Sequence, residues 1–308
     1  MSFNELLTPD DPNLIYYSPY NFLKDLDSVS LVRETVVEKI LSDLIKRELK
    51  VEEVTIDGLN CYFITRFLKW DTDYFGRNIY RIELVLRERN DIGFLNAAIK
   101  EFVNSRLKTN EYYYAIIPSE DLTLIQSLTS VGFKMVETRL NYYLSGISSI
   151  DLPRYQVRRA GISDIDALKS VASRMRNRFD RVHADSLFSQ DLADRYLETF
   201  IEKSVEGFAD MVLVPSTNDS KPFGFLAANK PVNVLNYKIA KLVLAAVDST
   251  YEKGWLLKLL FEVVNELKAY STDYLTTITQ SANRPAIRTW EKAGFRLGFT
   301  THVFSINK

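Results

Sequence analysis

The sequence predicts an α/β protein made of two similar halves, each a mixed sheet flanked by helices. Apolar β-like runs alternate with runs of helical spacing along the chain. The dipeptides Gly132-Phe133 and Gly294-Phe295 lie 162 residues apart, and at the same offset Asp121 aligns with Asn283. Because similarity at a fixed offset is typical of duplicated units, these observations indicate two tandem copies of one fold.

The first copy follows a Pro- and Asp-rich segment at residues 1–29. Its expected helices carry apolar residues on one face, and its expected strands are short apolar runs. Along the chain, the pattern predicts a helix at 30–49, strands at 51–56, 61–67 and 80–86, a helix at 95–107, a strand at 112–117, a helix at 119–130 and a strand at 135–144.

The second copy ends in the same order of elements as the first: a long helix, a strand, a short helix, Gly-Phe and a final strand. Asp164 or Ser163 can cap its first helix, and Pro285 fits the first turn of its last helix. The pattern predicts a strand near 155–159, a helix at 165–176, a helix around 193–196, a hairpin of strands 208–214 and 222–227, a strand at 239–247, a helix around 256–267, a strand at 274–278, a helix at 285–293 and a strand at 295–306.

The length of 308 residues fits two domains of about 150 residues each. A Ser/Gly/Pro-containing linker at 145–153 places the predicted boundary between domains 1–150 and 151–308.

The composition is that of an ordinary globular protein, with 46% hydrophobic and 26% charged residues. A net charge of −1, from 39 basic and 40 acidic residues, provides no general attraction to nucleic acid or to an anionic membrane. No apolar run approaches the roughly 20 residues of a membrane span, and the N-terminus lacks the layout of a signal peptide. Cys61 is the only cysteine, which excludes intrachain disulfides and multi-cysteine metal sites. We therefore expect a cytoplasmic protein without a metal, and a buried, unreactive Cys61.

The stretch from Asn283 to Phe295 resembles the C-terminal signature of the GNAT acetyltransferases, Asn-x-x-Ala-x-x-x-Tyr-x-x-x-Gly-Phe. Asn283, Ala286, Gly294 and Phe295 match it, and Trp290 stands where the family has Tyr. The resemblance implies that both halves are GNAT-like, or acyl-CoA N-acyltransferase, domains. It also implies acetyl-CoA as the acyl donor.

GNAT enzymes bind the donor's pyrophosphate on backbone N–H groups at a helix N-terminus, where unpaired donors and the helix dipole attract an anion. Gly254 keeps one small residue of the family's phosphate loop, whereas Glu252 and Leu256 depart from the usual pattern. By resemblance, the cofactor-binding residues are Val247, Glu252, Lys253, Gly254, Trp255, Leu256, Leu257, Asn283 and Trp290.

In the family, the Tyr replaced here by Trp290 protonates the leaving thiolate. An indole cannot do so because it is only a hydrogen-bond donor. The helical spacing of Trp290 with its apolar neighbours favours a place in the core. The residues that could act as the acid instead are Tyr251, His302 and His183.

Two further stretches resemble the dTDP-fucosamine acetyltransferases: residues 178–185 and the aromatic segment Leu68–Gly76. This resemblance implies that the acceptor is a small-molecule amine, the amino group of a nucleotide-activated amino sugar. The aromatic segment is otherwise explained as a turn that packs the two halves together. The first domain has no glycine-rich phosphate loop, so we expect it to be non-catalytic.

Two alternatives stay open. The altered residues Trp290, Glu252 and Leu256 fit a protein that binds a ligand or partner without acyl transfer. They also fit an acyltransferase with another donor, such as a longer acyl-CoA or an acyl carrier protein. The sequence leaves a homodimer open as well.

Overall fold

The computed structural model describes residues 1–216, 221–251 and 254–308. The chain divides into two compact units, which we describe separately. Unit 1 comprises Met1–Arg139 and Phe299–Lys308, and unit 2 comprises Leu140–Gly298. The division of the chain into two domains, residues 1–150 and residues 151–308, therefore remains a prediction.

Unit 1 contains a mixed sheet in the order β1-β2-β3-β4-β11-β5. Its strands β1, β2 and β3 are antiparallel, β3 and β4 are parallel, and β4 and β11 are antiparallel. Its elements are α1 (Phe3–Leu6), η1 (Leu14–Tyr17), α2 (Ser28–Val32), η2 (Arg33–Val37), α3 (Glu38–Ile45), β1 (Leu49–Ile56), β2 (Leu59–Phe67), α4 (Lys69–Phe75), β3 (Asn78–Arg87), α5 (Ile92–Arg106), β4 (Glu111–Pro118), α6 (Leu122–Val131), the start of β5 (Lys134–Ser145) and the end of β11 (Arg296–Asn307).

The differences from the expected elements of unit 1 are local. The helix expected at 30–49 contains a π-helical turn, η2, and ends at Ile45. The expected aromatic turn is the helix α4, which ends at Gly76 in the left-handed conformation. Within α4, Trp70 stacks on Tyr74 with ring centroids 5.6 Å apart, so these two aromatic side chains pack against each other along the helix.

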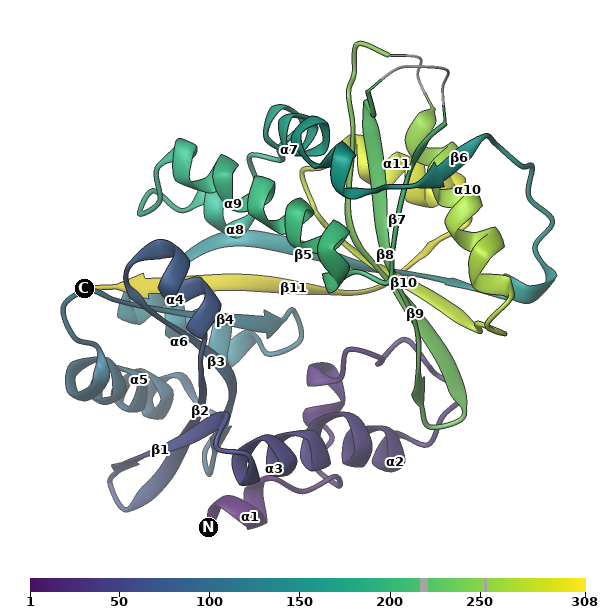
Figure 1. The fold of residues 1–308 in the computed structure, drawn as a ribbon. Coiled ribbons are helices and arrows are strands. Elements are labelled where there is room, and N and C mark those ends of the chain that lie inside the picture. Colours follow the sequence, from purple (N-terminus) through teal and green to yellow (C-terminus); the bar gives the residue numbers. More distant parts are fainter. Residues whose placement is uncertain (217–220, 252–253) are drawn as a thin grey trace. The chain divides into compact units, whose positions relative to one another are not determined.

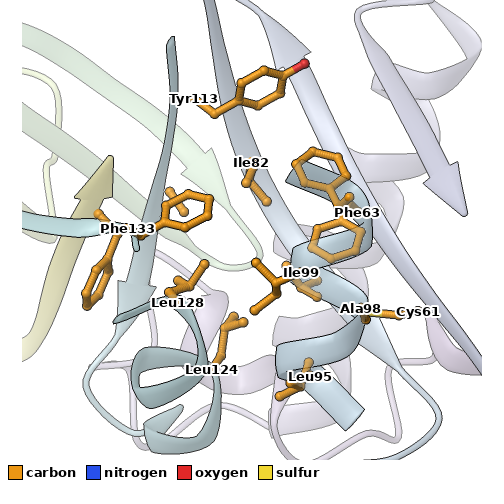
Figure 2. Packing of buried hydrophobic residues seen from close by; sticks show 14 of the residues in the cluster. Cys61, Phe63, Ile82, Leu95, Ala98, Ile99, Tyr113, Leu124, Leu128 and Phe133 are labelled. Carbon is orange, nitrogen blue, oxygen red and sulfur yellow. The ribbon is translucent and has the colours of Figure 1, made fainter. Parts of the chain in front are cut away.

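One core cluster of unit 1 lies between the sheet and helices α5 and α6 (Figure 2), and a second lies between the sheet and the N-terminal helices. Phe63 of β2 stacks on Phe102 of α5 with ring centroids 4.2 Å apart. Cys61 is fully buried in this core, and burial raises the pKa of its thiol to about 12. The thiolate is therefore disfavoured, which agrees with the expectation that Cys61 is unreactive.

The strands of unit 2 follow one another in the order β5-β10-β9-β8-β7-β6. The pairs β6–β7, β7–β8 and β8–β9 are antiparallel, and the pair β9–β10 is parallel. Its elements are the end of β5, η3 (Ile147–Ser149), β6 (Val157–Arg159), η4 (Ile162–Asp164), α7 (Ile165–Arg174), α8 (Arg181–Ala184), α9 (Gln190–Lys203), η5 (Ser204–Phe208), β7 (Met211–Pro215), β8 (Gly224–Val234), β9 (Tyr237–Val247), α10 (Trp255–Lys268), β10 (Tyr274–Gln280), α11 (Arg284–Lys292) and the start of β11.

Two apolar clusters form the core of unit 2. Helices α10 and α11 contribute to one cluster with β8, β9 and β10, and helices α7 and α9 contribute to the other. The strands of unit 2 therefore pack against two separate pairs of helices, one pair in each cluster.

The same local hydrogen bonds recur in the two units at the predicted offset. Asp121 accepts from the N–H of Leu124 at 3.2 Å, and Asn283 accepts from the N–H of Ala286 at 3.3 Å. Helices α6 and α11 then end alike, because Phe133 donates to the Leu128 carbonyl and Phe295 donates to the Trp290 carbonyl, both at 3.0 Å. This bond across the last turn is typical of a helix that ends in a left-handed glycine.

Each unit is completed by a strand that the sequence assigned to the other copy. Residues 301–307 of β11 pair with residues 112–118 of β4, so the C-terminal strand belongs to unit 1 (Figure 1). The second half of β5 belongs to unit 2, where the Tyr142 hydroxyl donates to Glu291 at 3.2 Å and Leu144 packs in the core. The two last strands are thus exchanged between the copies.

Candidate functional site

The parallel strands β9 and β10 of unit 2 separate partway along their length. Their pairing covers three residues on each strand and stops at Lys241 and Thr276. Beyond that point β9 continues to Val247 and β10 continues to Gln280. The strands therefore leave an opening at their C-terminal ends, which is where ligands bind in open α/β sheets.

The part of β9 beside this opening is apolar but only half-buried. Residues 244–247 pair with β8 on one side. On the other side, no strand pairs with them in the part of the chain that the structure describes. Because alternate backbone N–H groups of such a strand point away from its partner, this edge presents hydrogen-bond donors to the opening.

Helix α10 begins after this edge, and among the described residues no side chain caps its N-terminus. Its N-cap is Gly254, at a φ of 97°, a left-handed conformation that favours glycine. Helices α5, α9 and α11 are instead capped by the side chains of Asp91, Ser189 and Asn283. The first N–H groups of an α-helix have no intrahelical acceptor, so α10 presents them to an anion.

The turn before α10 is held by Asp248. This buried carboxylate accepts from the backbone N–H and the hydroxyl of Thr250 at 3.0 and 2.8 Å, and it pairs with Arg174 at 2.9 Å. These hydrogen bonds to Thr250, with the charge of Arg174, lower the pKa of Asp248. The carboxylate is therefore ionised near neutral pH and fixes the turn.

Three aromatic side chains meet at the same turn. Tyr251 stacks on Phe223 with ring centroids 4.1 Å apart and an angle of 9° between the rings. Trp255, the first residue of α10, contacts the same Phe223 edge-on at 5.5 Å. Phe223 is buried, whereas Tyr251 is 47% exposed.

Trp290 lies in the core of unit 2. It is 4% exposed and contacts Phe295 with ring centroids 5.8 Å apart. Its equivalent in unit 1 is Leu128, which is also buried, so the position is a core position in both copies. Its indole N–H has no hydrogen-bond partner among the described residues.

The segment from Arg174 to Asp180, here called the bridging segment, contacts the ends of both separated strands. Arg174 pairs with Asp248, which follows β9, and Asn177 donates to Gln280 at the end of β10. Two exposed side chains, Arg178 and Phe179, directly follow Asn177 in the sequence. The bridging segment therefore borders the opening.

His183 anchors the end of the bridging segment. Its side chain is fully buried, and its two ring nitrogens lie 2.7 Å from Asp180 and 3.1 Å from Asp194. Burial opposes the charged ring, but the hydrogen bonds and charges of the two carboxylates outweigh it and raise the pKa of His183. Both nitrogens are occupied, so the geometry gives His183 a structural role.

His302 belongs to unit 1. Its ring nitrogens lie 3.1 Å from the hydroxyls of Ser119 and of Thr138. Burial lowers the pKa of His302.

The structure brings several of the predicted donor-binding residues together. Val247, Leu256 and Leu257 are half-buried and pack against the core cluster that contains Trp290. Glu252 and Lys253 lie outside the described residues. Asn283 caps α11.

No group of three or more His, Cys, Asp or Glu side chains among the described residues is arranged to hold a metal ion. Among the same residues, no helix is both long and apolar enough to cross a membrane.

No protein-family model matches the chain, and no curated protein matches it in sequence. Solved structures do match it. A GCN5-related N-acetyltransferase from Sphaerobacter thermophilus superposes with a TM-score of 0.57 at 12% identity, covering 99% of this chain and 93% of that one. The fold is that of the GNAT acetyltransferases.

Two other structures also match the fold of this chain. A Drosophila protein matches with a TM-score of 0.50 at 13% identity, covering 99% of this chain and 96% of its own. A glucosamine N-acetyltransferase region of a fungal multi-domain β-N-acetylglucosaminidase matches with a TM-score of 0.52 at 10% identity, covering 80% of this chain and 31% of that one. The predicted fold class is confirmed.

The sequence did not predict the network around the bridging segment. Arg174 and Asp248 are 74 positions apart, and Asn177 and Gln280 are 103 apart, in elements without a shared pattern. Composition and spacing carry no signal for such pairs. The one available hint is the density of arginines at 174, 176 and 178, at the end of a predicted helix.

Proposed function

We propose that unit 2 binds acetyl-CoA and transfers its acetyl group to a primary amine. The observation that carries the proposal is the opening between β9 and β10, which lies beside a half-buried apolar edge and leads to the uncapped N-terminus of α10. An extended donor could lay its pantetheine arm along the apolar edge and its pyrophosphate on the helix N-terminus. The GNAT fold supports acyl transfer as the general chemistry.

In the proposed reaction, the neutral amine attacks the thioester carbonyl and forms a tetrahedral oxyanion. A backbone N–H on the open edge of β9, near Ala245 to Val247, would stabilise that oxyanion. The intermediate then collapses to the amide and expels the CoA thiolate. The proton lost by the amine passes to a basic residue or to water.

Protonation of the leaving thiolate does not require Trp290. A thiol has a pKa near roughly 8.5, so it can leave as thiolate near neutral pH and take its proton from solvent. Of the residues predicted as the acid, His183 has both nitrogens occupied, and His302 contacts Ser119 and Thr138 in unit 1. We therefore propose that solvent is the acid.

For the acceptor, we propose the amine of a nucleotide-activated amino sugar. The support is the resemblance of residues 178–185 to the dTDP-fucosamine acetyltransferases, together with Arg178 and Phe179, which are exposed on the bridging segment. Arg178 could pair with a diphosphate, and Phe179 could stack on a base. A homodimer and a cytoplasmic location remain predictions.

A second function, ligand or partner binding without transfer, is favoured by one observation. The family's acid position is taken by Trp290, which occupies the core like its counterpart Leu128. The other alternative is an acyltransferase with a donor other than acetyl-CoA. It is consistent with Leu256, which stands where the family's phosphate loop has a second small residue.

The test measures thermal unfolding with and without acetyl-CoA, followed by CoA release with a panel of amines that includes amino-sugar nucleotides. A ligand present at 100 times its Kd adds about 2.7 kcal/mol of stability. Gly254→Glu should weaken acetyl-CoA binding at least about tenfold, because it places a carboxylate beside the pyrophosphate.

Gly58→Glu is the matched control, since Gly58 also has a positive φ, 79°, and open space around its Cβ position. It should cost a similar backbone strain and leave acetyl-CoA binding unchanged. Stabilisation with amine-dependent CoA release supports the proposal. Stabilisation without release by any amine would favour the binding role, and no stabilisation by acetyl-CoA would overturn the proposal.

A further inference from the structure

The ring of Tyr251 has one covered face and one open face. Phe223 lies against the first face at 4.1 Å and nearly parallel, and Phe223 itself is buried. Tyr251 is still 47% exposed, so we take its second face, here called the open face, as the one available to a ligand. Its backbone N–H donates to the Asp248 carbonyl at 3.2 Å, and Asp248 is fixed in turn by Thr250 and Arg174. The open face is therefore presented in a defined orientation.

This face lies at the start of α10. Tyr251 and Trp255 contact the same Phe223 ring, and Trp255 is the first residue of the helix. The corresponding connection in unit 1, residues 88–91, contains no aromatic residue, so the ring is a feature of the connection in unit 2. An aromatic ring fixed beside an anion-binding helix N-terminus matches a ligand that carries a flat base next to its phosphates.

We propose that the open face of Tyr251 is the stacking surface for the adenine base of the acyl donor. The inference rests on the proposed function, because it assumes that a CoA thioester binds at α10. It names the nucleotide, and so distinguishes free acyl-CoA from a donor that carries only a phosphopantetheine arm. Stacking requires the ring and not the hydroxyl, and the ring is already ordered in the free protein, which lowers the entropy lost on binding.

The same geometry separates Tyr251 from the acid role. In acetyl-CoA the pantetheine arm lies between the pyrophosphate and the thioester. A residue at the pyrophosphate end therefore faces the nucleotide and not the leaving sulfur. The two roles make opposite predictions for the Tyr251→Phe variant.

The experiment measures Kd by calorimetry for two probes, acetyl-CoA and S-acetyl-4′-phosphopantetheine, which lacks the adenosine 3′,5′-bisphosphate portion and therefore the base. The proteins are wild type, Tyr251→Phe and Tyr251→Ala. The control is Tyr270→Ala, which removes a similarly exposed tyrosine beyond the other end of α10. Base stacking contributes about 1–3 kcal/mol, so Tyr251→Ala should weaken acetyl-CoA about 5- to 150-fold.

The Kd of the phosphopantetheine probe should be the same for wild type and Tyr251→Ala. Tyr251→Phe and Tyr270→Ala should bind both probes within about twofold of wild type, because each keeps the stacking ring. The inference is overturned if Tyr251→Ala leaves the acetyl-CoA Kd unchanged, or weakens both probes equally. If wild type binds acetyl-CoA and Tyr251→Ala binds it with the same Kd, the inference fails but the proposed function does not. If wild type binds neither probe, the proposed function fails with it.

Discussion

The two units begin their equivalent long helices in different ways. In unit 1, four residues (88–91) connect β3 to α5, and the Asp91 carboxylate accepts from the Phe94 N–H at 2.9 Å. In unit 2, seven residues (248–254) connect β9 to α10, and the N-cap is Gly254 without a side-chain cap. A carboxylate at a helix N-terminus occupies the place where an anionic ligand would bind. Unit 1 therefore supplies its own anion, and unit 2 leaves the place open.

The two units also differ in the charged contacts beside the ends of their strands. Arg87 at the end of β3 forms two hydrogen bonds with Asp121, at 2.9 and 2.7 Å, and Tyr17 donates to the same carboxylate at 2.6 Å. Burial, with the neighbouring Asp121, raises the pKa of Tyr17, so its hydroxyl stays a donor. The equivalent of Asp121 in unit 2 is the neutral Asn283. A duplicated fold thus carries an internally paired copy and an open copy, which supports the proposal that unit 1 is non-catalytic.

The largest expected effect is the loss of folding when the copies are separated. A chain of residues 1–150 lacks β11, whose residues 301–307 pair with β4 and whose Phe304 is buried in the core of unit 1. A chain of residues 151–308 lacks Tyr142 and Leu144 of unit 2. We expect neither piece to unfold cooperatively in urea, whereas co-expression should restore a complex. A sharp unfolding transition in isolated 1–150 would show that the exchanged strand is dispensable.

A smaller effect is expected from the ion pair that joins the strand ends in unit 1. Arg87→Ala leaves the buried Asp121 carboxylate without its cation and should cost about 3–5 kcal/mol in urea unfolding. Arg89→Ala is the control, because the Arg89–Asp91 pair is exposed and 3.5 Å long, and it should change stability by less than about 1 kcal/mol.

Asp121→Asn, which makes the residue like Asn283, should also destabilise, and combining it with Arg87→Ala should recover part of the loss. The acetyl-CoA affinity of the folded variants should not change, since the proposed donor site is in unit 2. Equal effects of Arg87→Ala and Arg89→Ala would mean that the buried pair does not hold unit 1 together.

The sequence could predict the features that depend on local spacing. The Gly-Phe dipeptides and the Asp121 and Asn283 caps are fixed by residues within one helix, so the repeat and the fold class followed from them. The strand exchange depends on pairing between β4 and β11, about 180 residues apart, and no local pattern specifies which of two similar strands fills a place. The same limit applies to Tyr17, which reaches Asp121 from 104 residues away.

The smallest expected effect is a difference between the two histidines, one in each unit. His183 has a raised pKa because of Asp180 and Asp194, so its contribution to stability is complete below the unfolded value of about 6.5 and is lost as the pH rises through the folded pKa. His302 has a pKa lowered by burial, so its contribution is present above about 6.5 and is lost as the pH falls.

The measurement is the urea unfolding free energy of wild type, His183→Gln and His302→Gln between about pH 5 and 9, the range that spans an unperturbed histidine pKa. The difference between wild type and His183→Gln should be roughly 1.5–3 kcal/mol at the acidic end, the value of hydrogen bonds to charged groups, and should shrink as the pH rises. The difference between wild type and His302→Gln should grow over the same range. A flat difference for His183 would mean that its ring is neutral between the two carboxylates, and the bridging segment would then be held by neutral hydrogen bonds alone.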